Sequence, residues 1–295
     1  MTTVVKIGGA RAVDPEGALA DVADLVAAGE EVVLVHGGST KVDDTLDRLG
    51  IDPEYVETPG GVVGRFTDAE TMEAFTMAMG AIRTDLVAGL QSRGVDAVGL
   101  SGVDGKLLHG PRTSAVRVID DGKRKIRRGD HSGTIEDVND DLLRVLFDAG
   151  RVPVVGPPMA GADDGAITPV NTDADGSAAA IAAALGARLV LLTDVAGVYA
   201  DPENPDTLIE CVDTPAAMAD LEAAAEGFMG RKVMATTDAL EGGATEVIVA
   251  NANADAPVTD AIEGGGTHVL PAAVADDVST PEETASGETT HEETT

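Results

Sequence analysis

The chain has 295 residues, with 52 Asp and Glu against 20 Lys and Arg, so its formal net charge is −32. This length and a hydrophobic content of 43% allow a sizeable buried core, while the charge disfavours nucleic acid and anionic membranes as partners. Six lysines and 2% aromatic residues are typical of a halophilic protein from a high-salt cytoplasm, with an ordinary acidic protein as the alternative.

Cysteine and histidine usage limits the chemistry further. Cys211 is the single cysteine, which excludes an intramolecular disulfide and a cysteine-rich metal site. The five histidines are scattered, so we expect no protein-held metal. The N-terminus enters a strand-like segment directly and no apolar run reaches membrane-spanning length, which predicts a soluble cytoplasmic protein.

Apolar segments alternate with helical patterns along the chain. The predicted strands are 4–7, 31–35, 96–100, 152–155, 189–192 and 246–249. The predicted helices are 15–29, a helix from Ser39, 67–94, 138–149, 174–186 and 230–241. The helix over 67–94 is predicted to open with a capping box from Thr67 to Glu70 and to stop at Gly94.

This alternation predicts an α/β fold with a mainly parallel central sheet covered on both faces. In such sheets, ligands gather at the carboxyl ends of the strands. Two segments depart from the pattern. Residues 115–128, AVRVIDDGKRKIRR, predict a β-hairpin that turns at Asp-Asp-Gly. The polar, acidic residues 276–295 predict a disordered tail.

Glycine pairs follow the first two predicted strands. Gly8 and Gly9 come shortly after Lys6, and Gly37 and Gly38 come directly before a helix. Glycine allows backbone N–H groups to approach a ligand closely, and a helix N-terminus favours an anion. Two such loops side by side could hold phosphate oxygens, although both pairs could also be ordinary tight turns. Neither a P-loop nor a dinucleotide-binding glycine motif is present.

The second half of the chain adds further candidates. Asn171, Asp173 and Asp175 stand ahead of an alanine-rich helix, where acidic residues could also serve only as helix caps. Lys232 lies in the first turns of a predicted helix, a placement that opposes the helix dipole and hints at a bound anion, unless it is a solvated surface lysine. Polar residues also follow the strand 189–192, namely Thr193, Asp194, Gly197 and Tyr199.

Taken in order, these segments resemble the amino acid kinase family, in particular its acetylglutamate kinase branch. The matching motifs are KIGG (6–9), HGGS (36–39), GRFTDAETM (64–72), VNTDAD (170–175), LTDVAGVYADP (192–202) and GRKV (230–233). Within the branch the chain is most similar to kinases that act on an amino acid bound to the small acidic carrier protein LysW. The HGGS motif, the GRFTD motif and a basic hairpin after VGLSGVDGKLL carry that similarity.

The resemblance implies an open αβα sandwich with two lobes. Residues 1–165 would bind the amino acid and form a homodimer, and residues 166–275 would bind ATP. The implied reaction is ATP-dependent phosphorylation of a side-chain carboxylate, which gives an acyl phosphate. A carboxylate is already ionised at neutral pH and needs no general base, so the enzyme must instead bring two anions together and neutralise charge on the transferred group.

The resemblance also implies roles for individual residues. Lys6 and Lys232 would bracket the transferred phosphoryl group, and Asp175 would orient both lysines. Arg65 would pair with the free α-carboxylate of the acceptor, and Asn171 would bind its acylated amino group. The residues implied to donate backbone N–H groups to phosphate oxygens or to the acceptor are Gly8, Gly9, Gly37 and Gly38. Those implied to lie near the nucleotide are Thr193, Asp194, Gly197 and Tyr199, whereas the role of Asp173 stays open. Mg²⁺ would be held mainly by ATP and water.

Seven of the 20 basic residues fall in one short segment, where they contrast with the acidity of the chain. They are Arg112, Arg117, Lys123, Arg124, Lys125, Arg127 and Arg128. On a projecting hairpin they would present a positive patch to the acidic carrier protein and accelerate the encounter. The alternative is a solvated hairpin whose basic residues pair with acids of the same chain.

Three functions therefore remain in competition. The first is a kinase for LysW-bound glutamate or 2-aminoadipate, in arginine or lysine biosynthesis. The second is an acetylglutamate kinase that acts on the free amino acid derivative. The third is a catalytically inactive nucleotide or amino-acid sensor of the same fold. Glutamate and aminoadipate differ by one methylene, which is worth only about 1–3 kcal/mol of discrimination.

Overall fold

A computed structural model describes residues 1–8, 14–59, 61, 63–120, 122–225 and 227–275 of the chain. The strands are β1 (Thr2–Ile7), β2 (Glu31–His36), β3 (Tyr55–Glu57), β4 (Val63–Arg65), β5 (Ala97–Gly102), β6 (Leu108–Asp120), β7 (Lys123–Gly133), β8 (Asp137–Val138), β9 (Val152–Asp163), β10 (Ala166–Val170), β11 (Arg188–Thr193), β12 (Cys211–Val212), β13 (Glu246–Asn251) and β14 (Thr267–Val269). The helices are α1 (Glu16–Ala27), α2 (Ser39–Leu49), α3 (Ala69–Gln91), α4 (Asp140–Asp148), α5 (Ala174–Leu185), α6 (Pro215–Ala224), α7 (Gly227–Glu241) and α8 (Pro257–Ile262).

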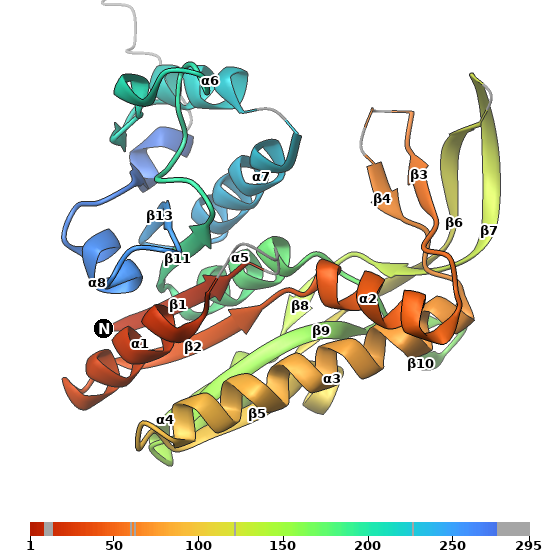
Figure 1. Cartoon of the computed structure of the whole chain (residues 1–295), viewed down its shortest axis with the longest axis horizontal. Helices are drawn as coiled ribbons and strands as arrows, with labels where there is room; N and C mark the ends of the chain where they lie inside the picture. Colours follow the sequence, from red (N-terminus) through yellow and green to blue (C-terminus); the bar gives the residue numbers. More distant parts are fainter. Residues whose placement is uncertain (9–13, 60, 62, 121, 226, 276–295) are drawn as a thin grey trace, which may run out of the picture.

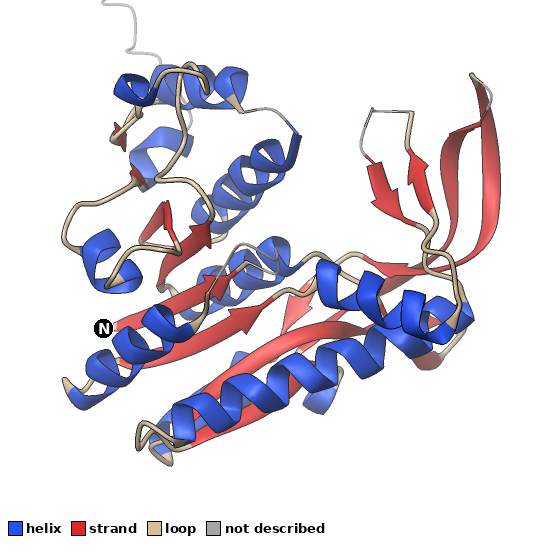
Figure 2. Ribbon diagram, in the orientation of Figure 1, coloured by secondary structure: helices blue, strands red, loops and turns tan. Residues whose placement is uncertain are grey.

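One sheet runs through the whole molecule in the order β12-β14-β13-β11-β1-β2-β9-β6-β3-β4 (Figure 1). Its centre is parallel, because β1 pairs in parallel with both β2 and β11, and β11 pairs in parallel with β13. Helices lie on both sides of these strands (Figure 2). The predicted α/β class, an open αβα sandwich with a mainly parallel sheet, is confirmed.

The central strands are hydrophobic on both faces, as strands covered by two helical layers must be. Val4 and Val33 pack into a cluster with α5 and α7, whereas Val5 and Ile7 pack with α1 and α3. The core consists mainly of Val, Leu, Ile and Ala side chains, as the low aromatic content required. Among the described residues, none of the helices combines the length and apolar character needed to span a bilayer.

The start of α3 differs from the sequence prediction. The helix runs over Ala69–Gln91, not 67–94, and its N-cap is Asp68, whose carboxylate accepts a hydrogen bond from the backbone N–H of Thr71 at 2.8 Å. The predicted capping box from Thr67 to Glu70 is therefore wrong by one position. Asp is as good an N-cap as Thr, and the Thr67 hydroxyl contacts Asn171 instead.

The predicted hairpin is present and is longer than expected. β6 and β7 pair antiparallel from Arg112↔Gly133 to Asp120↔Lys123, and Gly122 in the turn has a φ of 70°. Together with the β3–β4 hairpin, which sequence reasoning missed, they project from the edge of the molecule (Figure 1). Asp121 and the predicted disordered tail, 276–295, lie outside the described residues.

The proposed division between residues 1–165 and 166–275 is not marked by a break in the sheet. β10 pairs antiparallel with β9 across that boundary, from Ala166↔Asp163 to Val170↔Met159. The carboxyl end of β10 leads directly to Asn171 and then to α5. The two-lobe division therefore stays a prediction. In the sheet, β1 and β2 of the first part lie next to β11 of the second part, so residues of both parts meet at the carboxyl ends of these strands.

Candidate active site

The carboxyl ends of β1, β2 and β11 lie side by side. Ile7 is in register with His36 on one side and with Leu192 on the other. The backbone N–H of Gly37 also donates to the carbonyl of Ile7 at 3.3 Å. Gly8, Gly37 and Asp194, which directly follow these three strands, therefore lie at the same edge of the sheet, which is where parallel α/β sheets bind ligands.

Lys6, Asp175 and Lys232 form a buried cluster at this edge. Lys6 Nζ on β1 lies 2.6 Å from Asp175 Oδ1, and Lys232 Nζ on α7 donates a hydrogen bond to Asp175 Oδ2 at 3.0 Å. The Lys6–Oδ1 contact is close but lacks hydrogen-bond alignment, so it acts as an ion pair. Asp175 stands in the first turn of α5. The structure thus brings together the three residues predicted to carry the chemistry.

Burial and charge act in opposite directions on this cluster. For Asp175, burial favours the neutral acid, but the charges of Lys6 and Lys232 prevail and lower its pKa, so the carboxylate is ionised. For Lys6, burial is the largest effect, and with the repulsion from Lys232 it lowers the pKa from the ordinary 10.5. Two ammonium groups against one carboxylate leave net positive charge in a region of low dielectric, which favours an anionic ligand.

Asp173 has a structural role that the sequence left open. It is the N-cap of α5, and its Oδ2 accepts a hydrogen bond from the backbone N–H of Gly176 at 2.9 Å. The capping bond fixes the start of the helix on which Asp175 stands two residues later. Asp173 therefore sets the start of the helix, as Asp commonly does at this position, and its charge also opposes the lowering of the Lys6 pKa.

Close packing accounts for the glycine at position 38. Gly38 is the residue before α2, and a Cβ on it would lie 2.3 Å from Cδ1 of Ile82 on α3. No side chain caps this helix start, so backbone N–H groups of its first turn point out of the helix without a capping partner. His36 precedes the pair and is buried, which lowers its pKa to about 4 and keeps it neutral. Gly9 lies outside the described residues.

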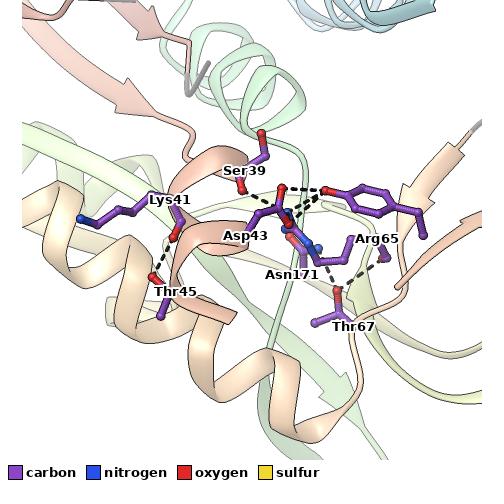
Figure 3. A network of polar contacts seen from close by, with 8 residues as sticks. Ser39, Lys41, Asp43, Thr45, Arg65, Thr67 and Asn171 are labelled. Atoms are coloured by element: carbon purple, nitrogen blue, oxygen red, sulfur yellow. Dashed lines mark hydrogen bonds and ion pairs between the residues drawn. The ribbon is translucent and has the colours of Figure 1, made fainter. Parts of the chain in front are cut away.

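Arg65 is surrounded by partners that sequence reasoning missed (Figure 3). Its Nη2 donates to Asp43 Oδ1 at 2.7 Å, to the carbonyl of Ser39 at 3.1 Å and to the Tyr55 hydroxyl at 3.1 Å. The side chain is only 6% exposed, and its Nε has no hydrogen-bond partner among the described residues. No sequence pattern links these residues, because β3, β4 and α2 meet only in the folded chain.

Asn171 lies in the same polar network as Arg65 (Figure 3). Its Nδ2 donates to Thr67 Oγ1 at 3.1 Å, and its backbone N–H donates to the carbonyl of His131 at 2.7 Å. His131 in turn donates its backbone N–H to the carbonyl of Thr67 at 2.7 Å. The end of β7, which belongs to the basic hairpin, therefore bonds to the backbones of both Thr67 and Asn171 and holds them in place.

One contact joins the Lys232 side of the site to the Arg65 side. Nη2 of Arg231, on α7, donates a hydrogen bond to the carbonyl of Val63 on β4. Arg231 directly precedes Lys232, and Val63 lies two residues before Arg65. This hydrogen bond ties α7, which carries Lys232, to β4, which carries Arg65, the candidate for binding the acceptor.

The predicted nucleotide residues follow β11 beside the lysine cluster. Thr193 is buried at the end of the strand and donates its hydroxyl to Asp194 Oδ1 at 3.1 Å. Gly197 has a packing reason for its identity, because a Cβ there would lie 2.6 Å from Thr267 Oγ1. Tyr199 is half-buried. Their position at the sheet edge fits a ligand site, and their contact with a nucleotide stays a prediction.

The seven basic residues of the hairpin are not equivalent. Arg112 sits at its base, where it pairs with Asp163 at 2.5 Å, while Arg127 pairs with Glu54 and lies over the Phe66 ring. Lys125 pairs with Asp120 at 2.6 Å. The basic residues without an ion pair to any described residue are Arg117, Lys123, Arg124 and Arg128.

No protein-held metal centre is apparent in the described part of the chain, since no three His, Cys, Asp or Glu side chains gather in a suitable arrangement there. A divalent ion at this site would therefore depend on phosphate oxygens and water for most of its ligands, as Mg²⁺ in nucleotide sites commonly does.

Comparison with known proteins agrees with this geometry. Residues 1–251 match the amino acid kinase family. The [LysW]-aminoadipate kinase of Thermus thermophilus is 40% identical over 262 residues, covering 86% of this chain and 95% of that protein. The acetylglutamate kinase of Methanopyrus kandleri is 41% identical over 252 residues, covering 84% and 94%. The structure of Giardia lamblia carbamate kinase bound to AMP-PNP matches with a TM-score of 0.63 at 17% identity, covering 91% and 98%, a likeness of fold alone.

Proposed function

The chain belongs to the amino acid kinase family and is a phosphotransferase, and from this premise we propose that it uses ATP to phosphorylate the side-chain carboxylate of a glutamate or 2-aminoadipate residue bound to a LysW-like carrier protein. The product is an acyl phosphate, an intermediate for arginine or lysine biosynthesis in the cytoplasm. The similarity to a [LysW]-aminoadipate kinase over 95% of that protein supports this choice of acceptor.

The observation that carries the proposal is the cluster of Lys6 and Lys232 on the single carboxylate of Asp175. An acceptor carboxylate and a phosphoryl group repel each other, so a positive region between them lowers the barrier most where charge builds up in transfer. Asp175 fixes both ammonium groups in place, which removes the need to reorganise them during the reaction. Lys6 and Lys232 then stabilise the transferred phosphoryl oxygens.

The acceptor side of the proposal rests on Arg65 and Asn171. Arg65 would pair with the α-carboxylate, and Asn171 with the acylated amino end, which leaves the side-chain carboxylate directed at the lysine cluster. Gly38 would offer its backbone N–H group between the two, whereas Gly37, whose N–H is bonded to the carbonyl of Ile7, would contribute the turn that positions it. Residues 1–165 would form most of this side and the homodimer contact, and residues 166–275 most of the nucleotide side.

The nucleotide side of the proposal rests on the loops after β1 and β11. Gly8 and Gly9, with Thr193 and Asp194, would lie against ATP, and Gly197 and Tyr199 would shape the pocket further along the loop. ATP supplies the phosphoryl group, and Mg²⁺ on its phosphates supplies additional positive charge. The chain's own contribution is orientation and the fixed charge of the lysine cluster.

The carrier would dock on one face of the hairpin. Side chains alternate between the two faces of a strand, and register places Arg117 opposite Ile126, and Arg124 and Arg128 on the same face as both. Arg127 and Lys125 lie on the other face and are paired within the chain. The proposed docking face is therefore Arg117, Arg124 and Arg128 around Ile126, which is 66% exposed. Arg112 and Lys123 would contribute less, the first because it is ion-paired at the base and the second because it lies on the opposite face.

A kinase for free acetylglutamate is the second candidate, favoured by the 41% identity to the Methanopyrus kandleri enzyme. Purified protein with MgATP would be given three acceptors: carrier-bound glutamate, carrier-bound aminoadipate and free acetylglutamate, with acyl phosphate trapped by hydroxylamine. We expect product on a carrier-bound acceptor. Turnover of free acetylglutamate with none on either carrier form would reject the proposal, and no ATP-dependent product at all would favour the inactive sensor.

A further inference from the structure

Arg65 is engaged by a carboxylate of the chain itself. Asp43 on α2 lies 2.7 Å from Arg65 Nη2, and the Tyr55 hydroxyl donates to Asp43 Oδ2 at 2.9 Å while it accepts from the same Arg65 nitrogen at 3.1 Å. The three side chains close a ring of hydrogen bonds. Burial raises the pKa of Tyr55, which keeps its hydroxyl protonated and able to donate to Asp43.

The two charges of this pair are unequally buried. The Arg65 side chain is 6% exposed, whereas that of Asp43 is 34% exposed. A guanidinium this deeply buried is costly unless an anion compensates it, and Asp43 provides that anion. Because Asp43 stands on the helix surface, it can rotate into solvent at a much smaller cost than Arg65 could.

The remaining donors of Arg65 indicate a place for one more acceptor. Its Nε is buried and has no hydrogen-bond partner among the described residues. An unsatisfied buried N–H of a charged group is unfavourable, and a planar carboxylate that binds two guanidinium nitrogens would satisfy it. Asp43 contacts the guanidinium only through Nη2, so it does not fill that role.

We propose that Asp43 is a built-in competitor for Arg65: it holds the guanidinium before the acceptor binds, and the α-carboxylate of the acceptor takes its place. This inference rests on the proposed role of Arg65 as the acceptor's carboxylate site. Binding is then an exchange of one carboxylate for another, so the net gain is smaller than for an uncompensated arginine. Asp43 thereby tunes the affinity and admits only acceptors whose own carboxylate can displace it.

The direction in which one substitution changes KM distinguishes a competitor of the acceptor from a residue that only positions Arg65. Asp43→Asn removes the charge and keeps the shape, so the acceptor meets less competition and its KM falls by roughly tenfold, the worth of one hydrogen bond to a charged group. A residue that merely positions Arg65 would raise KM when changed. Tyr55→Phe weakens the hold on Asp43 and is expected to lower KM in the same direction by a smaller factor.

The experiment compares steady-state KM for carrier-bound glutamate and for the same carrier bearing glutamate with its α-carboxylate amidated. The fall in KM is expected with the carboxylate form and not with the amide. Asp47→Asn, an exposed residue one turn along α2, controls for the loss of any negative charge near an anionic acceptor and should leave KM within about twofold.

If the expected fall in KM is not seen, the Arg65 variant shows whether the acceptor site or only the competitor role is wrong. Arg65→Gln should raise KM for the carboxylate form strongly; if it does not, the proposed acceptor site is wrong and the Asp43 inference falls with it. If Arg65→Gln raises KM but Asp43→Asn also raises it or leaves it unchanged, the acceptor site stands and the competitor role is overturned. Because Asp43→Asn leaves a buried charge uncompensated, its melting temperature should rise more on acceptor binding than that of the unmodified enzyme.

Discussion

Lys6 and Lys232 contact opposite oxygens of one carboxylate, that of Asp175, although one lysine lies in the first strand and the other in α7. The elements β1, α5 and α7, which are far apart in the sequence, therefore form one positively charged site at the edge of the sheet.

Asp175→Asn is expected to lower both stability and turnover. The amide leaves two buried ammonium groups without their anion, and breaking a buried pair in this way costs about 3–5 kcal/mol. Because the pKa of Asp175 is lowered in the folded protein, its stabilisation is present above the ordinary value near 3.8 and is lost as the pH falls through the lowered one. Urea unfolding at neutral and acidic pH would measure the difference, which should shrink in acid. A variant as stable as the parent at pH 7 would contradict the account.

The value of kcat/KM is expected to fall on the alkaline side at a lower pH than an ordinary lysine would allow. Burial, with repulsion from Lys232, lowers the pKa of Lys6 below 10.5, and only the protonated form can stabilise the phosphoryl group. A plot of kcat/KM against pH, which reports the free enzyme, should show this limb, and Lys6→Arg should move it to higher pH in whatever activity remains. An alkaline limb at or above 10.5 in the parent enzyme would be inconsistent with Lys6 as the responsible group.

Charge removal on the docking face should weaken turnover of the carrier-bound acceptor. Changing Arg117, Arg124 and Arg128 together to Gln is expected to raise KM by roughly tenfold or more at low salt, with a smaller effect at high salt. A control of equal charge change, Arg93, Arg144 and Arg151 to Gln, removes arginines in other regions. If both triple variants behave alike, the effect is one of net charge and the docking face is wrong.

Gly38→Ala should reduce kcat more than the control substitution Gly80→Ala does. A methyl group at this position meets Cδ1 of Ile82 at 2.3 Å and Cε of Met79 at 3.2 Å, so either these side chains or the start of α2 must shift, at a cost of about 1–3 kcal/mol. Gly80→Ala on α3 is the control, because nothing lies within 4 Å of its Cβ. Equal activity in the two variants would show that the spacing of the HGGS turn does not matter for transfer.

The sequence was sufficient for the elements that repeat a simple pattern. The apolar run 31–35 predicts a strand because a strand buried on both faces needs apolar residues throughout. The alanine-rich stretch after Asp173 predicts a helix because its length and residue types are typical of one. The Lys6–Asp175–Lys232 cluster could be predicted only through the family resemblance. Spacing along the chain does not reveal that β1 and α7 meet.

Other features depend on contacts that no local pattern records. Asp43 looks like any acidic residue on an exposed helix, and only the fold places it against Arg65. The capping error at Thr67 arose because Asp68 and Thr67 are both good caps, and the choice is settled by the pairing of Thr67 with Asn171. Likewise, the seven basic residues are one patch in the sequence, but strand alternation and ion pairs divide them in the structure.

The central claim is that two lysines on a shared carboxylate stabilise the phosphoryl group as it passes from ATP to the acceptor carboxylate. The direct test is the rate at which acyl phosphate forms in a single turnover from γ-labelled ATP and the carrier-bound acceptor, with Lys6→Met, Lys232→Met and the surface control Arg48→Met. The account predicts a loss of about 10²–10³-fold or more in the rate for each lysine variant and an unchanged rate for the control, with folding verified by circular dichroism. Acyl phosphate formation at the parent rate in either lysine variant would contradict it.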